Sequence, residues 1–261
     1  MDVNGNHIEL RDTGGDGPPL LFVHGILADH TVWRNQVRSF GGDHRVVCMD
    51  LRGFGMSTTR DPEIGFEDHA ADIAAVIDGL GLRDVTLVGW SMGGAIAQVM
   101  GPTPPDALRR IVMVDTTPQL LADEAFPHAI PPEAAQQLGA LMVEDYAAGC
   151  AAFAGLVAPE DEAVAADLAA IAQATRPEVG LAAFASSGAR DQLYELTRIE
   201  IETHVICGAE DGVCPPAASE YIAATVPGCT TPVATIEGAG HAPFLTRPEA
   251  FDAALRRALG G

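Results

Sequence analysis

The sequence predicts an α/β fold, in which a parallel sheet is covered by helices on both faces. Short apolar runs of strand length alternate with segments in which apolar residues recur every three or four positions. Ser, Asp and His residues follow several of these apolar runs directly, where ligands bind in open α/β sheets. An alanine-rich middle segment lacks strand-like runs, and it predicts a helical insertion between two strands.

The first 117 residues carry most of the predicted strands and helices. The runs that we interpret as strands are 7–11 (an edge strand), 20–23, 45–50, 85–89 and 111–115. Predicted helices lie between them, over 31–40, over 67–82, where Gly81 suits the C-terminal end, and from about 92 onward. Apolar strands that alternate with helices favour a parallel sheet buried on both faces.

The helical insertion is predicted over residues 118–198. Six of its residues step by three or four and predict one face of a helix: Leu138, Met142, Tyr146, Cys150, Phe153 and Val157. Strand patterns resume at 203–207 and 232–236, and a last helix is predicted over 248–259. We therefore expect a core made of residues 1–117 and 199–261, with residues 118–198 as a helical cap.

The composition excludes several classes of protein. The 261 residues carry a net charge of −21 and contain no lysine, so every basic residue is arginine. This charge disfavours binding of nucleic acid or of an anionic membrane, and the missing lysine removes Schiff-base and P-loop chemistry. The five cysteines form no C-x-x-C pair, and the first residues lack a signal-peptide pattern, which predicts free thiols and a cytoplasmic protein.

The uncharged segment 85–105 is the one candidate for a membrane span. It contains four glycines and three prolines, which suit a buried strand, a turn and a buried helix better than a spanning helix. We therefore expect no membrane partner.

The turn after strand 85–89 reads Gly-Trp-Ser-Met-Gly, with the serine at position 91. In a strand–turn–helix setting, G-x-S-x-G holds a nucleophilic serine in a strained conformation. Larger side chains at Gly89 and Gly93 would collide there, and Gly94 lets the next helix pack closely. We predict Ser91 as the nucleophile; the alternative is a glycine-rich turn used only for packing.

A serine nucleophile needs a general base and a carboxylate that orients it. Asp211 and His241 each follow a predicted strand, in the order Ser…Asp…His, and we predict them as acid and base. Asp115, which closes another strand, is the competing carboxylate. The backbone N–H groups of Ile26 and Met92 are the predicted oxyanion hole, and for His24 we favour a structural role in the same loop.

The substrate pocket is predicted between the core and the cap. The expected lining residues, besides Ile26, are Trp90, Leu27, Phe126, Phe153, Phe184 and Phe244. For each cap aromatic, packing is the alternative to lining. Arg176 and Arg190 are cap positions that could clamp a carboxylate, although we favour a solvated surface role for both.

These motifs resemble the α/β-hydrolase superfamily over nearly the whole chain. The matching segments are LLFVHG, VVCMDLRGFGMS, LVGWSMGGAIAQ, IVMVD, CGAEDGVCPP and GAGHAPFLTRPEAF. The resemblance implies an α/β-hydrolase fold, a Ser–His–Asp triad, a helical cap and neither cofactor nor metal. Within the superfamily, the motifs are similar to carboxylesterases that demethylate pimeloyl-carrier-protein ester, to acyl-homoserine-lactone lactonases and to enol-lactonases.

From this resemblance we expect a serine hydrolase that cleaves a small-to-medium apolar ester or lactone through an acyl-enzyme. The net charge of −21 would repel an acidic acyl-carrier protein, which favours a small free substrate. Two alternatives stay open. One is a C–C bond hydrolase of a diketone-type substrate, and the other is a non-catalytic ligand-binding hydrolase fold.

Overall fold

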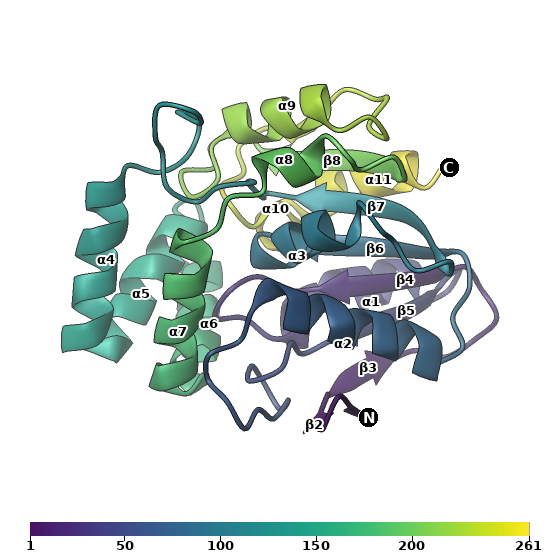
Figure 1. Cartoon of the computed structure of the whole chain (residues 1–261), viewed down its shortest axis with the longest axis horizontal. Helices are drawn as coiled ribbons and strands as arrows, with labels where there is room; N and C mark the ends of the chain where they lie inside the picture. Colours follow the sequence, from purple (N-terminus) through teal and green to yellow (C-terminus); the bar gives the residue numbers. More distant parts are fainter. Residues whose placement is uncertain (261) are drawn as a thin grey trace.

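A seven-stranded sheet forms the centre of the molecule in the computed structural model, which describes residues 1–260 (Figure 1). Only β3 runs antiparallel to its neighbour; the other neighbouring strands are parallel. In spatial order the strands are β3 (Leu10–Asp12), β5 (Arg45–Met49), β4 (Pro19–Val23), β6 (Val85–Trp90), β7 (Leu108–Val114), β8 (Glu202–Gly208) and β9 (Ala234–Ile236).

Helices cover both faces of this sheet, as the sequence predicts. α2 (Phe66–Gly79) and α3 (Met92–Met100) pack together in front of it, while α1 (Arg34–Phe40) and α11 (Pro248–Ala258) lie together behind it (Figure 1). All six residues of β6 are buried, as expected for a central parallel strand with both faces covered. The strand that leads to Ser91 is therefore held rigidly in the core.

Some of the predicted elements are divided in the structure. The edge strand over 7–11 is two pieces: β2 (Asn6–His7) pairs with β1 (Asp2–Val3), and β3 joins the main sheet. The helix over 31–40 begins as a 3₁₀ turn, η1 (His30–Trp33), and continues as α1. Two helices had no counterpart in the prediction, namely α9 (Pro216–Thr225) and the short α10 (Pro243–Thr246).

Five helices lie between β7 and β8. They are α4 (Pro132–Glu144), α5 (Tyr146–Val157), α6 (Glu162–Ala174), α7 (Pro177–Gly188) and α8 (Leu193–Leu196). We call α4–α7 the cap; these four helices stand together at one end of the sheet, while α8 packs on α3 (Figure 1).

The single helical face predicted from Leu138 to Val157 was wrong, because two helices share it. Asp145 separates α4 from α5 with an extended backbone (φ −142°), and its carboxylate accepts a hydrogen bond from the N–H of Ala148 at 3.0 Å. Aspartate is a favoured N-cap residue because this bond satisfies an N–H that the first helical turn leaves free. Asp145 therefore both ends α4 and caps the start of α5.

Two further sequence predictions concern the cysteines and a possible membrane span. All five cysteines are free thiols, as predicted, and four of them are buried. None of the helices within residues 1–260 combines the length and the apolar character that crossing a bilayer requires.

Candidate active site

Ser91 occupies a strained turn between β6 and α3. Its backbone has φ 54° and ψ −115°, a conformation that residues other than glycine rarely adopt. A Cβ atom at Gly89 would lie 2.4 Å from the carbonyl oxygen of Gly93, and one at Gly93 would lie 2.5 Å from that of Val23. These clashes are the physical reason that both flanking positions are glycine. The turn has the geometry expected of a nucleophile elbow.

Asp211 and His241 form a buried pair beside Trp90, the residue that precedes Ser91. The Nδ1 atom of His241 lies 2.8 Å from Oδ2 of Asp211. The other oxygen, Oδ1, accepts hydrogen bonds from the N–H groups of Val213 at 2.8 Å and Cys214 at 2.9 Å. A carboxylate acceptor selects the tautomer with a proton on Nδ1, which leaves Nε2 as an acceptor. This nitrogen is buried and has no hydrogen-bond partner among the described residues.

Trp90 connects the loop that carries His241 to the turn that carries Ser91. Its indole Nε1–H donates to the carbonyl oxygen of His241 at 2.7 Å, and the two rings lie 5.5 Å apart. Because Trp90 precedes Ser91 directly, this bond fixes the position of the histidine backbone relative to the serine.

Asp115, the competing carboxylate, makes no hydrogen bond to His241. It is fully buried at the end of β7, where Oδ1 accepts from the N–H of Gly208 at 2.7 Å and Oδ2 has no partner among the described residues. Burial, with the nearby charge of Asp211, raises the pKa of Asp115 well above its usual range. A neutral Asp115 beside Asp211 avoids a second buried charge, so the role of the charged acid falls to Asp211.

The two residues predicted as oxyanion donors, Ile26 and Met92, lie on chain segments next to Ser91. Met92 is the first residue of α3, where N–H groups lack an intrahelical acceptor. The loop after β4 approaches from the other side, since a Cβ atom at Gly25 would lie 3.0 Å from Cβ of Ser91. This loop carries Ile26, the second predicted donor.

His24 fixes the orientation of that loop, and this is the structural role that the sequence favours for it. Its Nδ1–H donates to the carbonyl oxygen of Gly25 at 2.7 Å, while Nε2 accepts the N–H of Leu51 at 2.9 Å. Burial lowers the pKa of His24, which keeps the ring neutral and able to accept. The C=O and N–H of a trans peptide point in opposite directions, so the bond to Gly25 turns the N–H of Ile26 away from His24.

The cap contacts the loop that carries the histidine. The carbonyl oxygen of Val157, at the end of α5, accepts from the N–H of His241 at 3.0 Å. The carboxylate of Glu160 accepts from the N–H of Gly240 at 2.7 Å. Sequence reasoning missed both contacts, because they join segments about 80 residues apart and no local pattern marks them.

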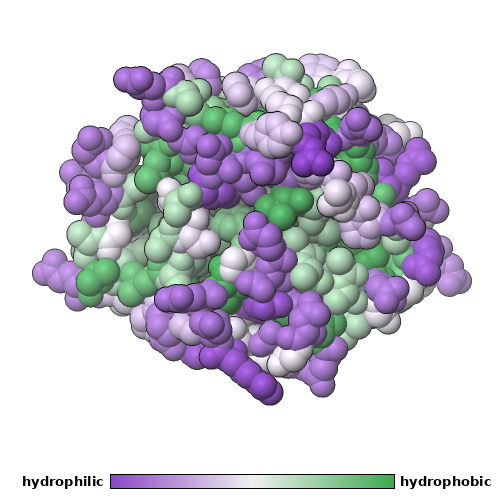
Figure 2. Space-filling model, viewed as in Figure 1, coloured by the Kyte–Doolittle hydropathy of each residue, from purple (hydrophilic) through white to green (hydrophobic). Residues whose placement is uncertain are grey.

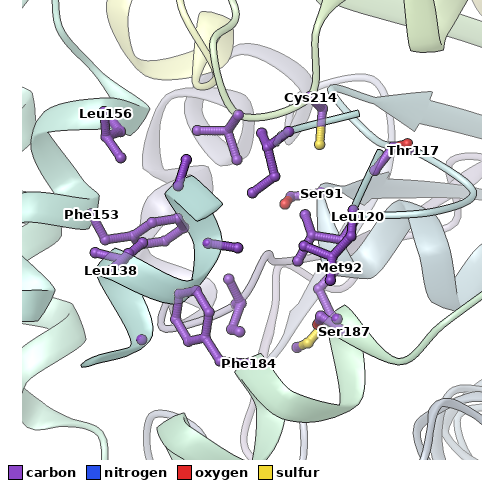
Figure 3. Close-up of a pocket in the computed structure, with 18 of the residues that line it drawn as sticks. Ser91, Met92, Thr117, Leu120, Leu138, Phe153, Leu156, Phe184, Ser187 and Cys214 are labelled. Atoms are coloured by element: carbon purple, nitrogen blue, oxygen red, sulfur yellow. The ribbon is translucent and has the colours of Figure 1, made fainter. Parts of the chain in front are cut away.

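A cavity of about 560 Å³ lies between the core and the cap. Ser91 lines it, and its hydroxyl points inward from the end of β6 (Figure 3). Three of the expected lining residues, Ile26, Phe153 and Phe184, also line it, and so does Met92, which was predicted as an oxyanion donor. Further apolar lining residues, which the prediction missed, come from the segment before α4 and from the cap: Leu120, Leu121, Ile130, Ala134, Leu138 and Leu181.

The other four expected lining residues lie outside the cavity wall. Trp90 packs edge-to-face on Phe244, 4.9 Å between ring centroids, and both rings are buried beneath the site. Phe126 packs against Tyr221 in a separate small cluster. Leu27 is only 2% exposed and belongs to the main core. Each of these side chains is fully used in packing, which was the alternative interpretation for the cap aromatic.

The mouth of the cavity is apolar. Val143 on α4 and Leu156 on α5 line it, yet they are 74% and 54% exposed. Apolar residues gather on the surface over the cap helices, at the left of the space-filling view (Figure 2). An apolar group of a ligand could therefore extend from the cavity across this rim.

Two clusters within the described residues bring possible metal-ligand atoms within 4.8 Å of one another. One is Asp211, Cys214 and His241, where the acid and base already bond to each other. The other is Asp29, His30 and Asp50, where Asp50 accepts hydrogen bonds from His30 and Met56. The carboxylates of Asp211 and Asp50 each accept several hydrogen bonds from nearby residues. These bonds account for the closeness of the side chains in each cluster.

Comparisons with known proteins agree with this architecture. A family model described as the alpha/beta hydrolase fold matches residues 18–248. A pimeloyl-[acyl-carrier protein] methyl ester esterase from Aeromonas salmonicida is 27% identical over 94% of this chain and 97% of its own. The Karrikin insensitive 2 receptor CA of Petunia hybrida is 26% identical over 95% and 94% of the two chains. The structure of Est816, described as an N-acyl homoserine lactone degrading enzyme, is 26% identical, with a TM-score of 0.81 over 98% of each chain.

Proposed function

The chain belongs to the α/β hydrolase family, and from this we propose that it hydrolyses a carboxylic ester or lactone through an acyl-enzyme on Ser91. The observation that carries the proposal is the strained Ser91, whose hydroxyl opens into an apolar cavity beside the buried Asp211–His241 pair. The names of the relatives, an ester esterase and a lactone-degrading enzyme, support this class of reaction.

In the first half-reaction, Nε2 of His241 takes the proton of Ser91 as the serine oxygen attacks the carbonyl carbon. Asp211 accepts the Nδ1–H bond and stabilises the imidazolium that forms. The N–H groups of Ile26 and Met92 donate to the oxyanion, and each such donor is worth roughly 3 kcal/mol in the transition state. His241 then returns its proton to the leaving alcohol oxygen, and the acyl group stays on Ser91.

Water completes the cycle. His241 takes a proton from water, the resulting hydroxide oxygen attacks the acyl carbon, and the Ser91 oxygen leaves with the proton that His241 returns. For a lactone, the alcohol released in the first step remains part of the product. Catalysis therefore needs only Ser91, His241, Asp211 and two backbone donors.

The cavity supports a small-to-medium apolar substrate. Its volume of about 560 Å³ falls within the range of roughly 300–1,000 Å³ that is typical of small-molecule sites. The chain's net charge of −21 works against docking of an acidic carrier protein, despite the esterase relatives that act on one. We therefore favour a free ester or lactone.

A ligand-binding module is the second candidate, because the relative from Petunia hybrida is named as a receptor. A receptor would bind its ligand tightly and turn it over slowly. A C–C bond hydrolase would instead cleave a vinylogous diketone and leave simple esters intact.

The test is hydrolysis of p-nitrophenyl esters, from acetyl to decanoyl, and of a γ-lactone between pH 5 and 9. We expect ester or lactone hydrolysis by the native protein, and a loss of at least about 10³-fold in Ser91→Ala. Ser187→Ala is the matched control, since Ser187 also lines the cavity but is not a hydrogen-bond partner of Asp211 or His241. Equal inactivity of the native protein and Ser91→Ala on every ester and lactone would overturn the proposal.

A further inference from the structure

Arg190 differs in charge from the other residues of the cavity wall. Arg190 follows α7, in the segment that connects the cap to α8. Among the described residues that line the cavity, only Arg190 has a charged side chain. The solvated surface role that the sequence favours for it is therefore wrong. The other cap arginine, Arg176, is about half exposed and pairs with Glu178 at 3.3 Å.

The guanidinium of Arg190 has no counter-ion within the described residues. Other partly buried arginines pair with carboxylates, as in Arg45–Asp12 and Arg52–Asp72. Within residues 1–260, no acidic oxygen lies within 4.0 Å of a nitrogen of Arg190. Its neighbour Cys214 does not supply the charge, since burial raises the pKa of that thiol well above its usual range. The cation is left uncompensated beside the cavity.

The contacts of Arg190 use only part of its hydrogen-bonding capacity. Nη2 donates to the carbonyl oxygen of Thr117 at 2.7 Å, and the Cζ atom lies 5.1 Å from the ring centroid of Phe66. Nε is buried and has no acceptor among the described residues. A guanidinium has five N–H donors, so several remain for a ligand.

An unpaired cation that is partly removed from water, as Arg190 is, is costly, because its desolvation is not offset by an opposite charge. Burial lowers the pKa of Arg190 to about 10, so the side chain stays charged at neutral pH. A carboxylate that entered the cavity would restore the lost electrostatic interaction, and its two oxygens match the planar fork of a guanidinium.

We propose that Arg190 binds a carboxylate of the substrate, and that the preferred substrates are half-esters of dicarboxylic acids with an apolar spacer between the ester and the carboxylate. This rests on the proposed function, which it narrows to a substrate class. The ester end lies at Ser91, the spacer contacts the apolar wall, and the free carboxylate pairs with Arg190. Hydrolysis of such a half-ester consumes one water and releases an alcohol and a dicarboxylate.

Arg190 also links the cap to the Thr117 loop, so a purely structural role must be separated from recognition. The experiment compares the monomethyl and dimethyl esters of one α,ω-dicarboxylic acid, tested from four to eight carbons. We expect the native enzyme to prefer the monoester at least 10-fold in kcat/KM. Arg190→Gln should lose 10- to 100-fold on the monoester, mainly in KM, and no more than about threefold on the diester.

Three further variants sharpen the result. Arg190→Lys keeps the positive charge but loses the planar donor geometry of the guanidinium. Its preference for the monoester over the diester should lie between those of the native enzyme and Arg190→Gln. Arg176→Gln is the matched control and should leave the preference unchanged. Ser91→Ala allows calorimetric binding of the intact monoester, and the double variant with Arg190→Gln should bind it at least 10-fold more weakly.

The outcomes separate this inference from the proposed function. If esters are cleaved but the native enzyme shows no preference, or Arg190→Gln loses equally on both esters, Arg190 is structural and the inference is overturned while the hydrolase proposal stands. If no ester is cleaved, yet the monoester binds and Arg190→Gln abolishes binding, carboxylate recognition stands and the hydrolase proposal fails.

Discussion

His24 makes two hydrogen bonds with different consequences, and two substitutions can separate them. In His24→Asn, the side-chain amide can replace Nδ1 as donor to the carbonyl oxygen of Gly25 but cannot reach Leu51. In His24→Gln, the longer side chain can place its oxygen where Nε2 accepts the N–H of Leu51, but it loses the bond to Gly25. One variant keeps the orientation of the Ile26 N–H, and the other keeps the buried acceptor.

The expected magnitudes differ between the two variants. In His24→Asn, the N–H of Leu51 is left unsatisfied in the core, which costs about 1–3 kcal/mol of unfolding free energy. At this chain length, that lowers Tm by roughly 2–4 °C per kcal/mol. In His24→Gln, the peptide after Gly25 is free to rotate, and full loss of one oxyanion donor costs about 10²–10³ in kcat. KM should change little, because the donor acts in the transition state.

The assay is steady-state hydrolysis of the best p-nitrophenyl ester, together with thermal unfolding of each variant. We expect His24→Asn to lose stability and keep most of kcat, and His24→Gln to show the reverse. If both variants lose kcat in proportion to their loss of Tm, or if His24→Gln keeps native kcat, the argument from the Gly25 peptide is refuted.

Three other predictions follow from burial at defined positions. Burial lowers the pKa of His69 from 6.5 to about 3, so the unfolded chain binds an extra proton below pH 6.5, and stability that is present above pH 6.5 is lost as pH falls. The loss at pH 4.5 is about 3 kcal/mol. Denaturant titrations of His69→Gln should show a flatter acid limb, and an unchanged limb contradicts this. Asp115→Asn should keep kcat within about threefold, because Asp115 is already neutral, whereas Asp211→Asn should lose about 10⁴-fold; equal losses would contradict the assignment of the acid. Phe184→Ala should shift the preferred acyl chain to greater length, whereas Phe126→Ala, outside the cavity, should lower Tm and leave the chain-length profile unchanged; a shift in both variants would refute the cavity assignment.

The parts that the sequence predicts well are those governed by local pattern. A buried strand such as β6 is an uninterrupted apolar run, and a turn that excludes side chains, as at Gly89 and Gly93, requires glycine. Parallel strands bring their carboxyl ends to one edge, so Asp211 and His241 meet even though 30 residues separate them.

The parts that it predicts poorly depend on how the cap helices pack. An aromatic residue is apolar whether it lines a cavity or fills a core, so Phe184 and Phe244 look alike in sequence but occupy different sites. Arg190 carries no local sign of burial, because its surroundings come from the loop after β7, from α2 and from the loop after β8. Asp145 did carry a signal, since an aspartate inside an alanine-rich helix is a typical N-cap.

The two hydrogen bonds from the cap to the histidine loop limit how this enzyme could be re-engineered. A designer who exchanged the cap for one from another hydrolase would remove the Val157 and Glu160 acceptors and leave the N–H groups of His241 and Gly240 unpaired. A transplanted cap would therefore alter turnover as well as substrate range. Successful chimeras should be those in which the junction leaves the end of α5 and Glu160 with the host, so that only the helices facing the ligand are exchanged.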